Sequence, residues 1–384
     1  MHSSGKVYIT GTSAFMPNAP VDNDGIENVL GMIAGKPSRA RRIVLRNNGI
    51  RWRHYAIDPA TGEATHTNAR LTAEAIRGLG DIGDIDCLST GTSMPDQLMP
   101  NHGVMVHGEL GNPPCEVVSS AGICVSGVSA LKYAYMAVRC GLAVNAVATG
   151  SEQASAVLTA RNFEAESEHR VAELETHPEI AFEKDFLRWM LSDGAGAFRL
   201  QAQPRAEGLS LRIEWIEILS QANHMDVCMY AGGEKQDDGS LKGWKTYPAE
   251  DWARRSVFAV KQDVRLLNDS VVAQTVGKPL QKAMASHGLT PAEVDWFLPH
   301  MSSEYFRQPI AACMAEVGFP VPQEKWFTNL STKGNTGSAA IYIMVDELLA
   351  SGRLTASDRL LCFVPESGRF TGSLIYLTAV DHAG

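Results

Sequence analysis

Short apolar runs rich in β-branched residues alternate with amphipathic stretches along most of the chain. The runs VYITG (7–11), CEVVSS (115–120) and VNAVATG (144–150) have the composition of buried strands. The stretches LTAEAIRGL (71–79) and SGVSALKYAYMAVRCG (126–141) repeat apolar residues at the helical period. Strands that alternate with helices are typical of α/β proteins, so the pattern predicts a sheet that is covered by helices.

The same alternation begins again after about residue 204. The second part contains apolar runs such as LSLRIEWIEI and VDWFLP, and each part ends in a glycine-rich turn followed by an apolar run: SDGAGAFRL (192–200) and ESGRFTGSLIYL (366–377). The pattern predicts two related halves, 1–204 and 205–384, that pack together. The acidic segment near 162–185 interrupts the first half, and we expect a solvated helical insertion there that caps the substrate.

Composition places the chain among ordinary folded proteins. Of its 384 residues, 45% are hydrophobic and 20% are charged, and the formal net charge is -9. This balance argues against a globally basic, nucleic-acid-binding protein. The chain has no apolar stretch of about 18 residues and no apolar signal core near its first residue, so we expect neither a membrane span nor secretion, and a cytoplasmic location.

One segment departs from the acidic balance. The stretch KPSRARRIVLRNNGIRWRH (36–54) holds seven lysines and arginines and no acidic residue. Such a run is either a solvated surface loop or a landing site for a phosphate-bearing or acidic partner.

Seven cysteines are scattered along the chain without a CxxC pair, which argues against a disulfide framework and a structural zinc site. Cys124 has the setting of a nucleophile, because a β run leads into it and a helix begins after it. A thiol there would lie near unpaired N–H groups and the positive end of the helix dipole, which favour the thiolate. The alternative is a cysteine that only packs. Cys115, Cys140 and Cys362 lie within strand or helix patterns and are assigned to packing.

A nucleophilic cysteine needs a base or donor and a site for the developing oxyanion. His300 follows the apolar run VDWFLP, so its imidazole stands at the carboxyl end of a predicted strand, where α/β proteins hold their sites. Asn335 lies between two glycines before a helix, and Gly368 lies between two β runs. Each has a structural alternative: a core histidine, a helix cap and a turn glycine.

Taken in chain order, these segments resemble the thiolase superfamily, specifically its ketosynthase III-type condensing enzymes. The resemblance rests on SSAGICVSG around Cys124, WFLPHMSSEYF, GNTGSAA, the two glycine-rich turns and NNGIRWRHYA, and it extends from about Val7 to the final strand. It implies an α/β thiolase fold, in which two pseudo-duplicated βαβαβαββ halves form a five-layer αβαβα sandwich.

The resemblance also implies roles for the site residues. Cys124 would take the acyl group as a thioester, and His300 and Asn335 would donate hydrogen bonds to the thioester carbonyl of the second substrate. The backbone N–H groups of Cys124 and Gly368 would hold the oxyanion of the acyl carbonyl. Joining two thioesters through carbon develops negative charge on two oxygens, and two donor sets meet that need. Neutral donors suffice, so we expect neither a metal nor another cofactor.

Substrates of this family arrive as thioesters of coenzyme A or of an acidic carrier protein that bears phosphopantetheine. The resemblance therefore favours the landing site for residues 36–54, with Arg46, Arg51 and Arg53 as candidate phosphate contacts. Family members form homodimers, and residues 85–110 are expected to contribute to the tunnel of the partner.

Departures from the usual family motifs narrow the range of substrates that we expect. PHMSSEYFR and SGRFTG stand where the family usually has PHQAN and GGGFTWG, and Ile123 replaces a small residue. The chain looks most like ketosynthases that form dialkylresorcinols and 2,5-dialkylcyclohexane-1,3-diones. Their chemistry joins an enzyme-bound acyl group, often α,β-unsaturated, to a β-ketoacyl thioester by Claisen condensation. A Michael addition then closes the ring.

Other functions stay open at this point. A conventional β-ketoacyl carrier-protein synthase III would use malonyl carrier protein and release CO2, and an acyltransferase on this scaffold would form an ester. A cysteine hydrolase also uses Cys, His and Asn in this order, although the usual C-G-S-C-W context is missing here. The last alternative is a non-catalytic protein that binds acyl thioesters.

Overall fold

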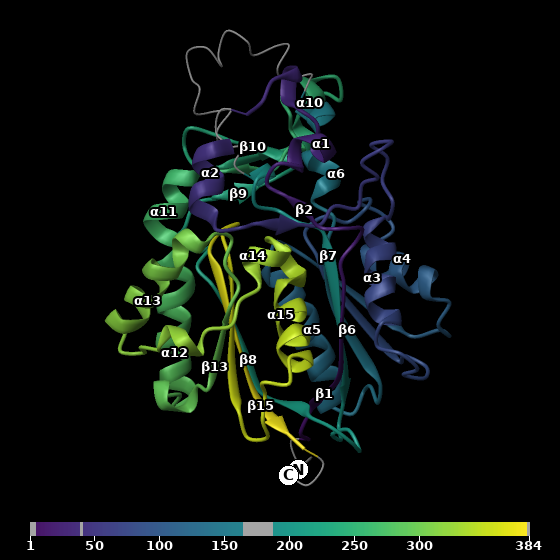
Figure 1. The fold of residues 1–384 in the computed structure, drawn as a ribbon, viewed down its shortest axis with the longest axis vertical. Coiled ribbons are helices and arrows are strands. Elements are labelled where there is room, and N and C mark those ends of the chain that lie inside the picture. The colour runs from purple at the N-terminus through teal and green to yellow at the C-terminus, as the bar shows by residue number, and fades with distance from the viewer. Residues whose placement is uncertain (1–4, 39–40, 164–186, 382–384) are drawn as a thin grey trace.

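Nine strands form one mixed sheet in the order β13-β14-β15-β8-β1-β7-β6-β4-β5. The computed structural model describes residues 5–38, 41–163 and 187–381 (Figure 1). The strands of this sheet are β1 Tyr8–Phe15, β4 Cys87–Thr92, β5 Glu116–Ala121, β6 Ala146–Glu152, β7 Gly194–Gln201, β8 Ser210–Ser220, β13 Trp296–Pro299, β14 Arg359–Glu366 and β15 Thr371–Val380. The shorter strands are β2 Val21–Asp22, β3 Trp52–Arg53, β9 Met229–Tyr230, β10 Gly233–Lys235, β11 Leu241–Gly243 and β12 Lys261–Gln262.

Strand directions follow the same pattern in the two parts of the sheet. In one part, β4 is parallel to β6, and β7 is antiparallel to both β6 and β1. In the other part, β13 is parallel to β14, and β15 is antiparallel to both β14 and β8. A short β1–β8 ladder joins the two parts. The predicted boundary between residues 204 and 205 lies between β7 and β8, while a common origin of the halves stays a prediction.

Helices lie between the two parts of the sheet and on both outer faces (Figure 1). The helices are α1 Ile26–Leu30, α2 Arg41–Asn48, α3 Asn68–Arg77, α4 His102–Leu110, α5 Val125–Arg139, α6 Ser155–Leu158, α10 Asp251–Arg254, α11 Val264–Val272, α12 Lys278–His287, α13 Arg307–Glu316, α14 Leu330–Lys333 and α15 Ala340–Ala350. The central helices α5 and α15 both contact strands of the two parts, α3 and α4 cover one outer face, and α11 to α13 cover the other. The predicted α/β architecture is confirmed.

Close packing at the centre depends on glycine. The segment Gly337–Ala339, which precedes α15, crosses β6 so closely that a Cβ at Gly150 would lie 2.1 Å from the Ser338 carbonyl oxygen. A Cβ at Gly127 on α5 would lie 2.3 Å from the same oxygen. The hydroxyl of Tyr342 on α15 donates to the Gly127 carbonyl at 2.9 Å. These contacts bring the start of α5 next to the loop that carries Asn335.

Local capping explains where several helices begin. The Thr67 side chain accepts a hydrogen bond from the Arg70 N–H, so α3 begins at Asn68, three residues before the predicted start. Asn101 caps α4 in the same way, and Gly111 ends that helix in the left-handed conformation with φ 66°.

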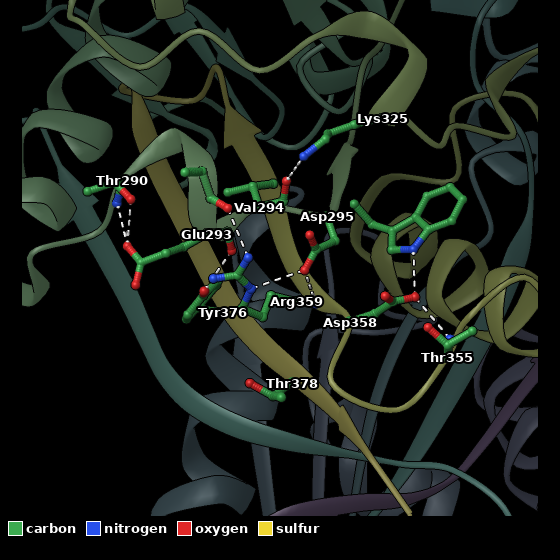
Figure 2. Close-up of polar contacts among 12 residues, drawn as sticks. Thr290, Glu293, Val294, Asp295, Lys325, Thr355, Asp358, Arg359, Tyr376 and Thr378 are labelled. Atoms are coloured by element: carbon green, nitrogen blue, oxygen red, sulfur yellow. Dashed lines mark hydrogen bonds and ion pairs between the residues drawn. The ribbon is translucent and has the colours of Figure 1, made fainter.

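A polar network fixes the start of β13 against β14 (Figure 2). The Asp295 carboxylate accepts hydrogen bonds from the backbone N–H and from Nε of Arg359, both at 3.0 Å. Tyr376 on β15 donates to the Glu293 carbonyl at 2.8 Å. Because β13 has only four residues, these contacts hold its register, and its opposite end leads directly to His300.

Two excursions leave the central fold. Apart from its first two residues, the acidic insertion predicted near 162–185 lies outside the described residues. A second excursion, which the hydrophobic pattern did not predict, spans residues 221–263 and contains β9 to β12 and α10 (Figure 1, top). Its strands β9 and β12 pair with each other. In the described part of the chain, no helix has the length and apolar character that a bilayer crossing requires.

Candidate active site

Cys124, His300 and Asn335 line one cavity, although they come from three distant parts of the sequence. Cys124 lies at the start of α5, His300 follows the end of β13, and Asn335 lies between α14 and α15. Gly368 lies in the turn between β14 and β15, and its Cα lies next to the side chain of Ile123. Ile123 also lines the cavity. The structure therefore brings the four predicted residues to one place.

The Cys124 side chain is half-buried at the N-cap of α5. Burial raises the pKa of its thiol well above the usual value, and the nearby Glu152 and Glu366 carboxylates raise it further. The expectation that the helix start favours a thiolate is therefore wrong for this structure. Cys124 is a neutral thiol here, and it must lose a proton when it attacks a thioester.

Glu366 raises the pKa of Cys124 after burial and the Glu152 carboxylate, and it does so from the helix start itself. Its Oε2 accepts hydrogen bonds from the backbone N–H groups of Ile123 and Val125, each at 3.2 Å. A carboxylate therefore already occupies the positive end of α5, and its charge opposes a second anion on Cys124. Burial raises the pKa of Glu366, while the two N–H donors lower it.

His300 is buried and held by its backbone. Its N–H donates to the Phe363 carbonyl on β14 at 2.8 Å, and within the described chain neither ring nitrogen has a hydrogen-bond partner. Burial lowers the pKa of His300 to about 4. At neutral pH the ring is therefore uncharged, and it can offer one N–H donor to a molecule in the cavity.

Asn335 is oriented by a turn of its own loop. Its backbone exchanges hydrogen bonds with the 190–192 segment, from Asn335 N–H to the Met190 carbonyl and from Ser192 N–H to the Asn335 carbonyl. Its Oδ1 accepts from the Gly337 N–H at 3.0 Å. This bond leaves Nδ2 as the free polar group of the side chain, so Asn335 presents a donor to the cavity.

The turn that carries Gly368 is fastened to the 221–263 excursion through its carbonyl groups. Cys228 N–H donates to the Gly368 carbonyl at 2.8 Å, and Met229 N–H donates to the Ser367 carbonyl at 3.2 Å. The N–H groups of Gly368 and Cys124 have no acceptor in another residue of the described chain. A Cβ on Gly368 would lie 3.0 Å from Cδ1 of Ile123, so the turn packs directly against the residue before the nucleophile.

The rest of the cavity wall is mainly apolar. It consists of side chains from α11, the 273–277 turn that follows it, the 304–306 turn, α13, β14, the 187–191 segment and the excursion, among them Leu187, Met190, Met229, Leu267, Val271, Val276, Phe306, Ile310 and Phe363. Three functional contributions were missed by the sequence analysis: Met229 and Gln262 from the excursion, and the carboxylate of Glu152. The sequence signal for Glu152 was an acidic residue directly after the apolar run AVATGS.

The candidate phosphate contacts divide into two kinds. Arg46 on α2 and Arg51 after it are exposed, and Arg51 Nε donates to the Ser331 hydroxyl at 2.9 Å. Arg53 is completely buried, and its guanidinium donates to the Trp189 carbonyl and to Oδ1 of Asn23. The prediction that Arg53 contacts phosphate is therefore wrong, because its guanidinium is buried and donates to the Trp189 backbone and the Asn23 side chain.

Three other cysteines were assigned to packing. Cys362 is buried and Cys115 is half-buried, in line with that assignment. Cys140 is exposed at the end of α5, so the assignment is wrong there.

Sequence comparisons extend over most of the chain. Residues 284–377 match the family model described as 3-oxoacyl-[acyl-carrier-protein] synthase III C terminal. The β-ketoacyl-[acyl-carrier-protein] synthase III of Xanthomonas oryzae pv. oryzae is 25% identical over 372 residues, which cover 93% of this chain and 94% of the relative. The enzyme of the same name from Rhodobacter capsulatus is 24% identical over 377 residues, covering 96% and 98%.

Structural comparisons give the same fold. A tetronic acid condensing enzyme superposes with a TM-score of 0.72 at 19% identity, covering 97% of this chain and 99% of the other. OleA of Xanthomonas campestris, solved with lauric acid and lauroyl-CoA bound, gives 0.71 at 19% identity, covering 98% and 100%. The synthase III of Pseudomonas aeruginosa gives 0.68 at 18% identity, covering 97% and 98%. The predicted thiolase-type fold is confirmed, and the sequence relatives support the resemblance to ketosynthase III enzymes.

Proposed function

We propose that this ketosynthase III-like chain is a condensing enzyme that joins an acyl group held on Cys124 to a β-ketoacyl thioester. The observation that carries the proposal is a single cavity in which one thiol, two neutral donors and an apolar wall meet. The thiol can take the acyl group, the donors can stabilise an enolate oxygen, and the apolar wall can hold an alkyl chain. No metal or organic cofactor is needed for these steps.

The reaction proceeds in two stages. The Cys124 sulfur first attacks an acyl thioester, and the carrier thiol leaves with the proton. C4 of the β-ketoacyl thioester then attacks the acyl carbonyl on Cys124 in a Claisen condensation, which releases the Cys124 sulfur. His300 and Asn335 hold the enolate oxygen of the attacking thioester, and the N–H groups of Cys124 and Gly368 hold the oxyanion at the acyl carbonyl.

Ring closure follows when the acyl group is α,β-unsaturated. C2 of the former β-ketoacyl unit adds to the β-carbon of the new enone, which closes a six-membered ring with C4 and its alkyl group between the two ketone carbons. Hydrolysis of the thioester and loss of C1 as CO2 then give a 2,5-dialkylcyclohexane-1,3-dione.

The charges around the cavity favour a β-ketoacyl group over a malonyl group. The described residues that line the cavity include no lysine and no arginine, and their one carboxylic acid is Glu152. A malonyl carboxylate would therefore meet no cation there and would be repelled by an ionised Glu152. A β-ketoacyl group carries no charge at its reacting end.

Product analysis tests this function. The enzyme is incubated with an α,β-unsaturated acyl thioester and a β-ketoacyl thioester, and in parallel with the acyl thioester and malonyl carrier protein. We expect a cyclic dione from the first mixture. Stoichiometric CO2 from the second mixture without any dione from the first would support the conventional synthase, and release of free acid alone would support a hydrolase.

A groove beside the cavity supports thioester delivery on coenzyme A or a phosphopantetheine carrier. It is lined by residues of α2, α11 and the 303–306 segment, and it shares Leu267 and Phe306 with the cavity wall. Arg46 lies on α2, and Arg51 follows that helix. We propose that these two arginines bind the phosphates of the carrier while the pantetheine arm follows the groove.

We expect the double substitution Arg46→Ala with Arg51→Ala to raise KM for the acyl thioester about fivefold with little change in kcat, because each of the two exposed charge-assisted contacts contributes about 0.5 kcal/mol. Steady-state kinetics at low ionic strength measure this. Arg205→Ala, an exposed arginine between β7 and β8, is the matched control. An unchanged KM in the double variant would show that Arg46 and Arg51 do not bind the carrier.

We also propose that the chain forms a homodimer. The edge strand β5 has an open side and only partly buried residues. The neighbouring segment between β4 and α4 exposes Leu98 and Met99 by 68% and 85%. An open edge strand and exposed apolar side chains at one place are typical of an interface between copies.

We expect Met99→Asp to shift the chain from dimer toward monomer in sedimentation velocity, because a carboxylate would be buried without a partner. Val144→Asp, at a residue that is 76% exposed, is the control and should leave the sedimentation coefficient unchanged. A wild-type protein that sediments as a monomer at all concentrations would refute the dimer.

A further inference from the structure

Glu152 is a buried carboxylate in the wall of the same cavity as Cys124, His300 and Asn335. It is the last residue of β6, and none of the steps above uses it. Two neighbouring residues hold its side chain. Ser93 donates from its N–H at 3.2 Å and from its hydroxyl at 2.6 Å, and Ser338 donates from its N–H at 3.1 Å.

These contacts leave one oxygen of Glu152 available. Oε1 accepts from both N–H groups, whereas Oε2 accepts from the Ser93 hydroxyl alone. A carboxylate has about four lone-pair positions, so Oε2 keeps one position that can take a proton. Gly337 makes room for this carboxylate, since a Cβ there would lie 2.7 Å from Glu152 Cγ. The side chain is thus held in place while it stays open to the cavity.

The proposed condensation requires a base. A malonyl thioester forms its carbanion by losing CO2, but a β-ketoacyl thioester forms it only when a group removes the proton from the attacking carbon, C4. His300 is assigned to donate to the enolate oxygen, and its burial without an anionic partner disfavours the protonated ring. Asn335 is not basic. Among the described cavity residues, this leaves Glu152 as the carboxylate that can accept a proton.

We propose that Glu152 is the general base that removes the proton from C4 of the β-ketoacyl thioester, the carbon that attacks the acyl group. The inference rests on the proposed function. The C4–H bond breaks, the proton moves to Oε2, and the electron pair forms an enolate whose oxygen is held by His300 and Asn335. C4 then bonds to the acyl carbon as the carbon–sulfur bond to Cys124 breaks. The proton on Glu152 returns to the Cys124 sulfur, so no other reactant is needed.

The pKa of Glu152 supports this role. Burial raises it to about 7, while the Ser93 and Ser338 hydrogen bonds act in the opposite direction. The titratable groups around it are Cys124 and His300 in the cavity, Glu366 at the start of α5 and His102, whose Nε2 contacts the hydroxyl of the preceding Ser151. Burial lowers the pKa of His102 to about 4, so both histidines are neutral near pH 7.

The test compares Glu152→Gln with the wild type in two separate reactions. Acyl transfer to Cys124 is followed by intact-protein mass spectrometry, and condensation is followed as product released from pre-acylated enzyme and a β-ketoacyl thioester. We expect acyl transfer to stay within about threefold and condensation to fall at least 100-fold, the usual range for a general base. Condensation by the wild type should rise with pH through about 7 as Glu152 ionises, and the variant should lose that rise.

Two further variants separate a chemical role from a structural one. Ser93→Ala removes a hydrogen bond that lowers the Glu152 pKa, so it should move the rise in condensation rate to higher pH by about half a unit or more. Glu366 is the other carboxylate near Cys124, but it does not line the cavity. In Glu366→Gln, the condensation rate should therefore rise at the same pH as in the wild type.

The outcomes distinguish this inference from the proposed function. A wild-type enzyme that never condenses a β-ketoacyl thioester would refute the proposed function. A wild-type enzyme that does condense it, together with an unchanged pH profile in Glu152→Gln or in Ser93→Ala, would refute the role of Glu152. Equal losses of acyl transfer and condensation in Glu152→Gln, with no shift in Ser93→Ala, would assign Glu152 a structural role alone.

Discussion

Replacing Cys124 with alanine should abolish both the acyl adduct and the condensation product. The sulfur is the proposed attachment point of the acyl group, so its removal leaves nothing to hold the electrophile in the cavity. We expect product formation to fall by about 10⁴-fold or more. Liquid chromatography with mass spectrometry measures the product, and intact-protein mass spectrometry measures the adduct. Because Cys124 is only half-buried at a helix start, the alanine variant should keep its fold.

The matched control is Cys140→Ala, which removes an exposed thiol at the other end of the same helix. It should retain both the adduct and the product. An acyl adduct that persists in Cys124→Ala but disappears in Cys140→Ala would show that Cys140, and not Cys124, is the nucleophile.

The second large effect should separate the two stages of the reaction. We expect His300→Ala and Asn335→Ala each to lower the rate of condensation by about 10²–10³-fold, because each removes a donor to the enolate oxygen. Acyl transfer to Cys124 should fall much less, since its oxyanion is held by backbone N–H groups. Single-turnover experiments that start from free enzyme and from pre-acylated enzyme measure the two stages separately.

Asn335→Asp is a sharper variant of the same test. It keeps the size of the side chain but replaces the free Nδ2 donor with an oxygen. Condensation should fall at least as far as in Asn335→Ala. Normal condensation in both His300→Ala and Asn335→Asp would mean that these residues do not hold the enolate.

Much of the fold and the main site could be predicted from the sequence, because the signals are local. Strand and helix periods are repeated within short segments, and the motifs around Cys124, His300 and Asn335 each lie within one segment. Their meeting in one cavity followed from the family resemblance, and the geometry agrees with it.

The errors concern contacts between distant segments. The Cys124 thiol was expected to ionise easily, but burial raises its pKa most, followed by the carboxylates of Glu152 and Glu366. Glu366 lies 243 residues from its hydrogen-bond partner Ile123. Arg53 looked like Arg46 and Arg51 in the sequence, but its guanidinium reaches the carbonyl of Trp189, 136 residues away. No local pattern distinguishes a buried arginine from an exposed one when the partner is a backbone carbonyl.

The 221–263 excursion was not predicted, whereas the cap predicted near 162–185 lies outside the described residues except for its first two and stays a prediction. An acidic stretch near 162–185 drew attention because its charge stands out, whereas the 221–263 excursion has no single charge or period that marks it. Its importance comes from three-dimensional contacts: Met229 and Gln262 line the cavity, and Gln262 Nε2 donates to the Ser367 hydroxyl at 3.0 Å. Through these contacts, the excursion holds the turn that carries Gly368.

The central claim is that an acyl group on Cys124 is joined through carbon to a β-ketoacyl thioester. The most direct test loads the enzyme with an isotopically labelled acyl group, removes excess donor, adds β-ketoacyl thioester and follows protein and product by mass spectrometry. The account predicts that the label leaves Cys124 at the rate at which it appears in a product with a new carbon–carbon bond, in the absence of malonyl carrier protein. An adduct that is unchanged by the β-ketoacyl thioester but consumed by malonyl carrier protein with release of CO2 would contradict it.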